Sequence, residues 1–167
     1  MSNVRVSLLA DLLEGAQKHT LEIAASVPES HRLKQLQEGK ATPLWCVGHL
    51  ANTINAIVLV YTLEEASLMS KEQSVLFSPD FIGGKAPTGN ADDYPGWDEV
   101  IEIYNTVFAK ALAGIRNLDD DVLGNPLPGK IPEDFRAFFS SIGATLGIMI
   151  NHDAYHRGQI GMIAKLD

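Results

Sequence analysis

Two histidines four positions apart, His152 and His156, are the residues of this chain whose type and spacing most clearly suggest chemistry. Residues at positions i and i+4 of a helix lie on one face, with Cβ atoms about 5–6 Å apart. Two imidazoles at that spacing can bind one metal ion through bonds of about 2.0–2.1 Å. One such histidine alone is usually a hydrogen-bonded core residue. Two side by side would desolvate each other, and a shared cation relieves both, so the pair predicts part of a metal site.

A third ligand has to come from another helix, and His49 is the candidate. It lies in the segment 41–63, which contains no Asp, Glu, Lys or Arg, and an unpaired polar ring would be costly to bury there. Taken alone, His49 also fits an ordinary core histidine. The pair further resembles the H-E-x-x-H motif of zinc proteases, with Asp153 in place of the glutamate. The eleven residues after His156 contain no His or Glu to complete such a site, so a protease is not expected.

Polar residues one turn away from the histidines are candidates for orienting the imidazole rings. Asn52 and Thr53 follow His49 by three and four positions, and Gln159 follows His156 by three. A hydrogen bond to the second ring nitrogen of a metal-bound histidine fixes the orientation and the tautomer of the ring. The alternative, that these are ordinary polar residues of a helix face, fits the sequence equally well.

Three further side chains near these residues have weaker claims to chemistry. Asp153 is a candidate proton acceptor, although it lies at the centre of an apolar stripe and could instead bind a neighbouring helix. Arg157 could hold an anionic substrate, but pairing with a surface carboxylate is favoured. Cys46 lies three residues before His49, a rotation of about 300° on a helix, and is expected to be a packed core thiol on a different face.

Helices must position these residues, because apolar residues recur at helical spacing in four stretches and no convincing strand pattern is present. The expected helices are 6–27, 43–65, 97–117 and a fourth that begins after 132 and continues to the C-terminus. Thr42 and Pro43 provide an N-cap and a first-turn proline for the second helix. The stretch 66–95 is expected to be a long structureless connection, mobile or functional. The sequence thus predicts an all-α fold, a four-helix bundle with a long crossover connection between helices two and three.

Length and composition limit the class of protein. With 167 residues and a net charge of −8, the chain is expected to form one domain, 1–167, that binds neither nucleic acid nor anionic membranes. The single cysteine, and acidic residues within the apolar N-terminal stretch, favour a cytoplasmic protein without a signal peptide. The uncharged segment 41–63 is long enough to cross a bilayer, but His49 and Asn52 lie inside it, so a buried core helix is favoured.

Two motifs together resemble the DinB-like superfamily of small bacterial proteins. The first is Trp45-Cys-Val-Gly-His49-Leu-Ala, and the second, near the end of the chain, is His152-Asp-Ala-Tyr-His156-Arg-Gly-Gln-Ile. The resemblance implies a four-helix bundle with a divalent metal ion held by three histidines, one from helix two and two from helix four. At the matching positions of this sequence these are His49, His152 and His156.

The resemblance also implies an activity. Relatives include transferases and isomerases that use low-molecular-weight thiols, and many others have no assigned reaction. Three imidazoles leave open positions on an ion for water or substrate, as in catalytic metal sites. We therefore expect a metal-dependent enzyme with a small-molecule substrate, in which a thiol-dependent transferase or isomerase is favoured over a hydrolase. Imidazole ligands suit Zn, Ni or Fe, so the identity of the metal stays open.

Two alternatives to an enzyme stay open at this point. The ion could be structural or sensory in a non-catalytic metal-binding helical bundle, or the three histidines could be unrelated residues of a helical interaction module.

The resemblance also bears on the oligomeric state. Members of the family are often homodimers, and the largely uncharged faces of the second helix leave room for such contact. A homodimer is therefore expected.

Overall fold

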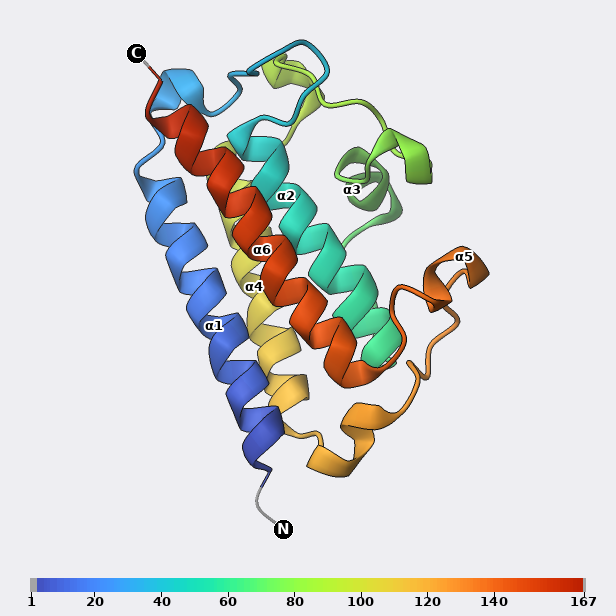
Figure 1. The fold of residues 1–167 in the computed structure, drawn as a ribbon. Helices are drawn as coiled ribbons and strands as arrows, with labels where there is room; N and C mark the ends of the chain where they lie inside the picture. Colours follow the sequence, from blue (N-terminus) through green and yellow to red (C-terminus); the bar gives the residue numbers. More distant parts are fainter. Residues whose placement is uncertain (1–2, 167) are drawn as a thin grey trace.

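Every regular element in the described part of the chain is helical. The computed structural model describes residues 3–166, and no strand occurs among them. Four long helical stretches lie side by side (Figure 1): α1 (Val4–Ala25), α2 (Pro43–Thr53) with its continuation Ile54–Thr62, α4 (Trp97–Arg116) and α6 (Ile142–Ala164). The helices α1 and α2 each pack against both α4 and α6. The predicted all-α class is confirmed.

The helix α2 runs through the core. Its N-cap is Thr42, whose hydroxyl accepts a hydrogen bond from the N–H of Trp45 at 3.1 Å, and every residue from Pro43 through Asn52 is buried. The most apolar 18-residue window of Pro43–Thr62 has a mean hydropathy of 1.4, high enough for a membrane span, but 72% of that window is buried inside the protein. It therefore has the character of a core helix, as predicted. The uncharged residues of α2 already pack inside the chain, which leaves them little surface for a second copy.

The hydrogen-bonding pattern of this second helix changes after Thr53. The sequence predicts a regular helix toward Glu65, whereas Ile54–Thr62 is π-helical, with wider turns. At its end the carbonyl of Tyr61 accepts a hydrogen bond from the N–H of Gly129 at 2.9 Å. A Cβ atom on Gly129 would lie 2.6 Å from the Cα of Tyr61, so only glycine allows this approach. The loop that leads into α5 (Glu133–Arg136) is thereby fixed on the π-helical segment.

The connection 66–95 contains regular structure, which corrects the prediction of a structureless segment. It holds α3 (Lys71–Leu76) and two single turns of 3-10 helix, Asp80–Ile82 and Ala91–Asp93. Ser70 and Gln73 form a capping box at the start of α3. The hydroxyl of Ser70 accepts from the N–H of Gln73 at 3.1 Å, and the side chain of Gln73 accepts from the N–H of Ser70 at 2.9 Å. A helix of six residues is too short to show an apolar period, which is why periodicity does not reveal it.

The last long helix begins later than the sequence predicts. Residues directly after Pro132 form the short helix α5, and α6 starts only at Ile142. Ser141 is its N-cap, and its hydroxyl accepts a hydrogen bond from the N–H of Ala144 at 3.3 Å. As a result, α5 and the loops around it stand beside the long helices on the same side as α3 (Figure 1).

Candidate metal centre

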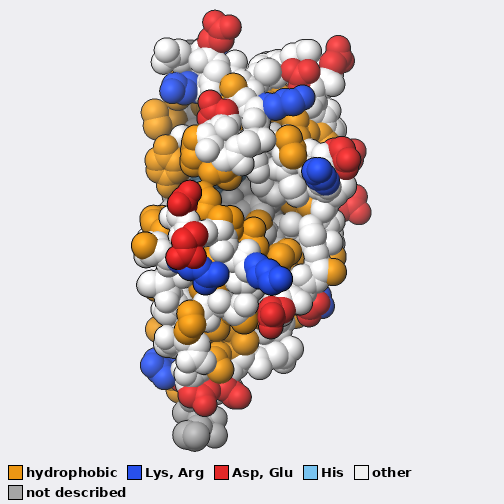
Figure 2. Space-filling view, turned by 90° about the vertical axis from the view of Figure 1, so that its right-hand side faces the viewer, with side chains coloured by type: hydrophobic (Ala, Val, Ile, Leu, Met, Phe, Trp, Pro, Cys, Tyr) orange, Lys and Arg blue, Asp and Glu red, His pale blue; other side chains and the backbone are white. Residues whose placement is uncertain are grey.

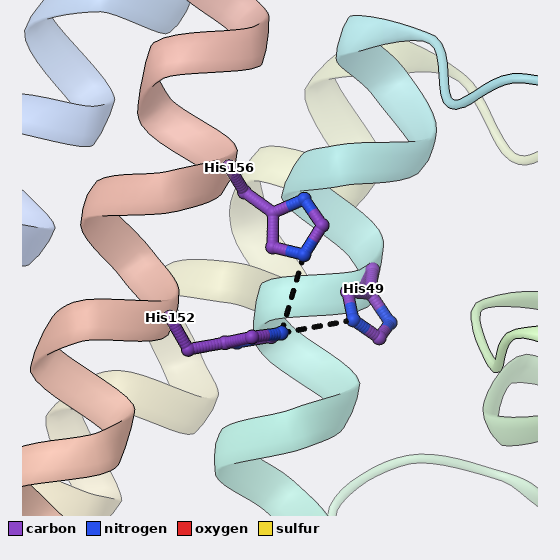
Figure 3. Close-up of side chains that lie close together, drawn as sticks. All are labelled: His49, His152 and His156. Atoms are coloured by element: carbon purple, nitrogen blue, oxygen red, sulfur yellow. Dashed lines mark hydrogen bonds between the residues drawn. The ribbon is translucent and has the colours of Figure 1, made fainter.

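Three histidines meet between α2 and α6. His49 comes from α2, while His152 and His156 come from successive turns of α6 (Figure 3). The Nε2 atom of His152 lies 3.2 Å from the Nε2 atom of each of the other two rings. Within residues 3–166, these three form a group whose ligand atoms all lie within 4.8 Å of one another, as metal ligands must. The structure therefore brings together the three histidines that the sequence singles out.

The second nitrogen of two of these rings is held by an oxygen that accepts hydrogen bonds. The Nδ1 of His49 lies 2.8 Å from the carbonyl oxygen of Phe77, and the Nδ1 of His156 lies 2.7 Å from the Oε1 of Gln159. Because a carbonyl oxygen only accepts, each Nδ1 carries the proton, and each Nε2 is left with a lone pair. Both lone pairs are directed at the Nε2 of His152.

In this arrangement the three rings have fewer N–H donors than nitrogen lone pairs that could accept a hydrogen bond. A neutral His152 has at most one proton on Nε2, and it lies equally far from two acceptors, so it cannot satisfy both. At least one buried lone pair then has no donor, which is unfavourable. One cation at the point where the three Nε2 atoms converge would satisfy every ring. The donor set thus fits a metal ion.

The spacing of the nitrogens also fits metal coordination. Two nitrogens bound to one ion at about 2.1 Å are about 3.0 Å apart at a right angle and about 3.4 Å apart at the tetrahedral angle. The two distances to the Nε2 of His152, both 3.2 Å, lie between these values, and the ligand atoms of His49 and His156 lie within 4.8 Å of each other. The geometry is therefore compatible with octahedral and tetrahedral ions alike, and it does not choose among Zn, Ni and Fe.

Burial keeps these histidines neutral. Desolvation lowers the pKa of His49, and it lowers the pKa of His152 to about 4 and that of His156 to about 3. The charge that neighbouring histidines would carry lowers the pKa of His152 and His156 further. At neutral pH all three imidazoles are therefore unprotonated, which is the state that binds metal.

A cavity of about 750 Å³ borders the cluster. His49 and His152 lie in its wall, together with side chains from the π-helical segment, from α6 and from the segments that carry α3 and α5. Figure 2 shows the corresponding hollow at mid-height on the face where α3 and α5 lie, with hydrophobic side chains around it. An ion on the three histidines would therefore be reachable from solvent by a small molecule.

The comparison with protein families agrees with this site. A family model described as the DinB superfamily matches residues 12–160. The chain belongs to the DinB superfamily. A comparison with curated proteins finds no match. The part of this DinB-superfamily chain that the model matches contains all three histidines, so the resemblance carried by two short motifs extends over most of the chain.

Trp45 supports the histidine cluster of this DinB-superfamily chain from the side. Its ring stacks on that of His49, with centroids 4.6 Å apart and an angle of 10° between the planes, and its edge faces the ring of His156 at 6.4 Å. The indole N–H donates to the carbonyl of Leu76 at 3.2 Å, which fixes the ring. In the sequence Trp45 is only a motif residue, although its position four before His49 is the spacing of neighbours on a helix.

Gly48 allows the segment after α3 to reach His49. A Cβ atom at this position would lie 2.2 Å from the ring of Phe77. Without it, the fully buried Phe77 ring packs directly on α2, and its backbone carbonyl accepts the Nδ1 proton of His49. Phe77 is a functional residue that the sequence analysis missed, because a backbone carbonyl has no signature in the sequence.

Of the three residues expected to orient the rings, only Gln159 contacts one. Asn52 instead donates through Nδ2 to the carbonyl of Ser74 at 3.2 Å and to the hydroxyl of Ser78 at 3.0 Å. The hydroxyl of Thr53 donates to the backbone carbonyl of His49 at 2.8 Å, within its own helix. Asn52 therefore ties α2 to the α3 segment, and Thr53 acts on the helix and not on the imidazole.

Asp153 faces α1 and α4 and does not bind the histidines. Its carboxylate accepts hydrogen bonds from the hydroxyl of Thr20 at 2.7 Å and from that of Tyr104 at 3.0 Å, and it is 1% exposed. Burial raises the pKa of Asp153, whereas these two donors and Arg157 oppose the rise. Burial and the neighbouring carboxylate also raise the pKa of Tyr104. With both oxygens engaged, the carboxylate is tied into the helix packing.

Arg157 and Cys46 also differ from their expected surroundings. Arg157 pairs with the buried Asp153 at 3.3 Å and donates to the carbonyl of Ala16, so its partner is an interior carboxylate and not one at the surface. Cys46 is fully buried, as expected, but its Sγ lies 3.6 Å from the Oε1 of Gln159, beside the cluster. Burial raises the pKa of this thiol to about 12, which makes it a poor nucleophile.

Proposed function

We propose that this chain is a divalent-metal-dependent enzyme in which His49, His152 and His156 are the protein ligands. One observation carries the proposal: three neutral imidazoles direct their ring nitrogens at a common point that borders a cavity. A structural site is normally closed by four protein ligands, whereas a catalytic one keeps positions for water or substrate. No fourth His, Cys, Asp or Glu joins the group within residues 3–166.

The scaffold we propose is the four-helix bundle of the family. Its helices would be α1, α2 with its π-helical continuation, α4 and α6, with the segment 66–95 as the crossover connection. In this arrangement His49 on the second long helix faces the histidine pair on the last one across one helix–helix contact. The packing of α2 against α6 supports this arrangement.

The ion would lower the pKa of a bound thiol or water and polarise an electrophile. The three histidines would hold the ion, and the cavity would admit substrate. The carbonyl oxygens of Phe77 and Gln159 would accept hydrogen bonds from the Nδ1–H groups of His49 and His156 and so keep these protons on Nδ1. In a transfer reaction the thiol sulfur forms a bond to an electrophilic carbon. The leaving group departs with the electron pair of the broken bond, and the thiol proton passes to solvent.

A thiol-dependent transferase or isomerase is favoured over a hydrolase. Zinc hydrolases of the H-E-x-x-H type use a carboxylate as general base beside the ion. No Asp or Glu lines this cavity, and both oxygens of Asp153 are bound elsewhere. A thiol, with a pKa of about 8.5, needs far less help to ionise than water, at about 15.7. The thiol-using relatives of the family support the same choice.

Metal content and turnover together test this proposal. Elemental analysis of protein purified without a metal-binding tag should find one divalent ion per chain. A panel of low-molecular-weight thiols with electrophiles should then show turnover in loaded protein and none in metal-free protein or His156→Ala. His19→Ala is the matched control, because His19 is exposed on α1, and it should keep full activity. Equal turnover in His156→Ala would remove the metal from the mechanism, and a full equivalent of metal without turnover would favour a structural or sensory site.

A further inference from the structure

The cavity beside the histidines has the size of an organic ligand site. Its volume of about 750 Å³ lies within the range of about 300–1,000 Å³ that is usual for pockets binding small molecules. The π-helical segment and α6 form one side of it, and the segments that carry α3 and α5 form the other. Because His49 and His152 lie in the wall, a molecule in the cavity would be adjacent to the proposed metal.

The wall of the cavity carries no charge. None of the residues that line it is Lys, Arg, Asp or Glu, and its aromatic side chains include Phe135 and Phe139. Two further phenylalanines, Phe81 and Phe138, line it although they are 80% and 60% exposed. Exposed phenylalanines at the edge of an apolar cavity are typical of surfaces that contact a ligand. A charged ligand would lose water here without gaining a partner, which is strongly unfavourable.

The Oδ1 of Asn52 is a polar atom in the wall that remains available to a ligand near the histidines. Asn52 lies one turn after His49, and its Nδ2 donates to the carbonyl of Ser74, which fixes the orientation of the amide. Its Oδ1 makes no hydrogen bond within residues 3–166 and can accept one from an O–H or N–H group. The hydroxyl of Thr53, by contrast, already donates within its own helix.

From this wall we infer that the cavity binds an uncharged, mainly apolar organic molecule whose polar end lies toward His49, His152 and the Oδ1 of Asn52. This inference rests on the proposed function, in which that molecule is the electrophilic substrate. The charged groups of a cellular thiol would then stay outside the cavity, in solvent, and only its sulfur would approach the ion. The substrate class is thereby narrowed from any electrophile to neutral aromatic or aliphatic ones.

Three probes with one carbon skeleton test the inference. These are 1-naphthylmethanol, which is neutral, 1-naphthoate, which is an anion, and 1-naphthylmethylammonium, which is a cation. Their affinities are measured by calorimetry on the metal-free full chain, because a carboxylate could otherwise bind the ion itself. The alcohol should bind at least tenfold more tightly than either charged probe. Equal or tighter binding of the naphthoate, or no saturable binding of the alcohol, would overturn the inference.

A lysine placed in the wall should reverse the preference between the two oxygen-bearing probes. Ala56 lines the cavity, and Ala56→Lys should strengthen binding of the naphthoate relative to the alcohol by more than the wild-type preference for the alcohol, so that the naphthoate binds more tightly. Leu8→Lys, on the exposed side of α1, is the matched control and should leave the order unchanged. If circular dichroism shows that Ala56→Lys does not fold, Ile148→Lys tests the α6 wall in the same way. An unchanged order in the folded wall variant, or the same reversal in Leu8→Lys, would contradict the inference.

The metal content of the same preparations separates this inference from the proposed function. If the wild-type chain prefers the alcohol but takes up no divalent ion, the proposed enzyme is wrong and the cavity remains a site for neutral ligands. If it takes up one ion but binds the naphthoate as well as the alcohol in its metal-free state, the metal site stands and the substrate class is wrong.

Discussion

His152 and Asp153 are neighbours on α6 and belong to two different clusters of polar side chains. Only the cluster around Asp153 has all its hydrogen bonds made within the chain. Asp153 has a partner on α1, another on α4 and a third, Arg157, on its own helix, so each carboxylate oxygen accepts at least one hydrogen bond. Within residues 3–166, the recorded partners of the His152 ring are two ring nitrogens, each of which holds a lone pair. Both clusters are largely buried. The hydrogen bonds of the Asp153 cluster are completed within the chain, whereas the facing nitrogens of the histidine cluster are compatible with a bound cation.

The difference shows how a buried polar residue is assigned to packing or to chemistry. A polar group whose hydrogen bonds are all made inside the chain stabilises one arrangement of helices. A group of acceptors that face one another has no such solution within the protein and indicates a ligand that is not part of the chain. Position in the sequence cannot tell the two apart, since His152 and Asp153 are adjacent.

Removing a histidine should have the largest effect. His152→Ala and His156→Ala should each weaken metal binding by more than about a hundredfold, because loss of a hydrogen-bonding partner of a ligand already costs about 10–100-fold. Elemental analysis after dialysis against a chelator measures the loss. Asp153→Asn, on the same helix, should keep a full equivalent of the ion. A histidine variant that retains the ion, or an Asp153→Asn variant that loses it, would contradict the division between the clusters.

Acid should destabilise the metal-free protein through the histidine cluster. The pKa is about 4 for His152 and about 3 for His156 in the folded state, against about 6.5 in the unfolded chain. Below about pH 6.5 the unfolded state therefore binds protons that the folded state does not, and the free energy of unfolding falls as the pH falls. Urea unfolding should show a loss of about 3 kcal/mol between about pH 7 and pH 5.

Two comparisons make the acid effect specific to the cluster. The double variant His152→Ala/His156→Ala should show a much flatter dependence of stability on pH, because its unfolded state no longer gains these protons. Saturating metal should raise the stability at each pH by mass action. A wild-type stability that stays constant from pH 7 to pH 5 without metal would show that the histidines are not held neutral.

Asp153→Ala should lower stability without affecting the metal. The change leaves the hydroxyls of Thr20 and Tyr104 without their acceptor and Arg157 without its ion pair. We expect a loss of about 2 kcal/mol in the free energy of unfolding, since Arg157 is partly exposed and can turn to solvent. Tyr104→Phe removes one donor only and should cost about 1 kcal/mol. If the metal content fell with either change, the two clusters would not be independent of each other.

The parts of the site that lie on one helix could be predicted from the sequence. The pair His152 and His156 follows from helical spacing, and Gln159 contacts His156 because it lies one turn further on the same helix. His49 is predicted because a polar ring in an uncharged helix needs a partner and because the two motifs resemble the DinB-like superfamily. The long helices follow from their apolar periods for the same reason.

The contacts that come from other segments could not be predicted. The α3 segment supplies the carbonyl of Phe77, which holds His49, and the acceptors that bind Asn52. Because α3 is too short for a periodic pattern, the sequence does not reveal the contacts that this segment makes, and it places Asn52 beside the imidazoles instead. In the same way, the partners of Asp153 lie on α1 and α4, far from it in sequence.

Gly48→Ala should weaken metal binding less than the loss of a histidine does, and it tests whether the contact from the α3 segment matters to the histidine cluster. The added methyl would meet the Phe77 ring, so the ring must shift and its carbonyl must move away from the Nδ1 of His49. We expect metal affinity to fall by about tenfold and the free energy of unfolding by about 1–2 kcal/mol. Gly15→Ala in α1, where no atom lies within 4 Å of the added Cβ, is the matched control and should leave metal binding unchanged. If chelator competition gives Gly48→Ala the affinity of the wild type while its stability falls, Phe77 serves packing alone, and His49 is then oriented mainly by the stacked ring of Trp45.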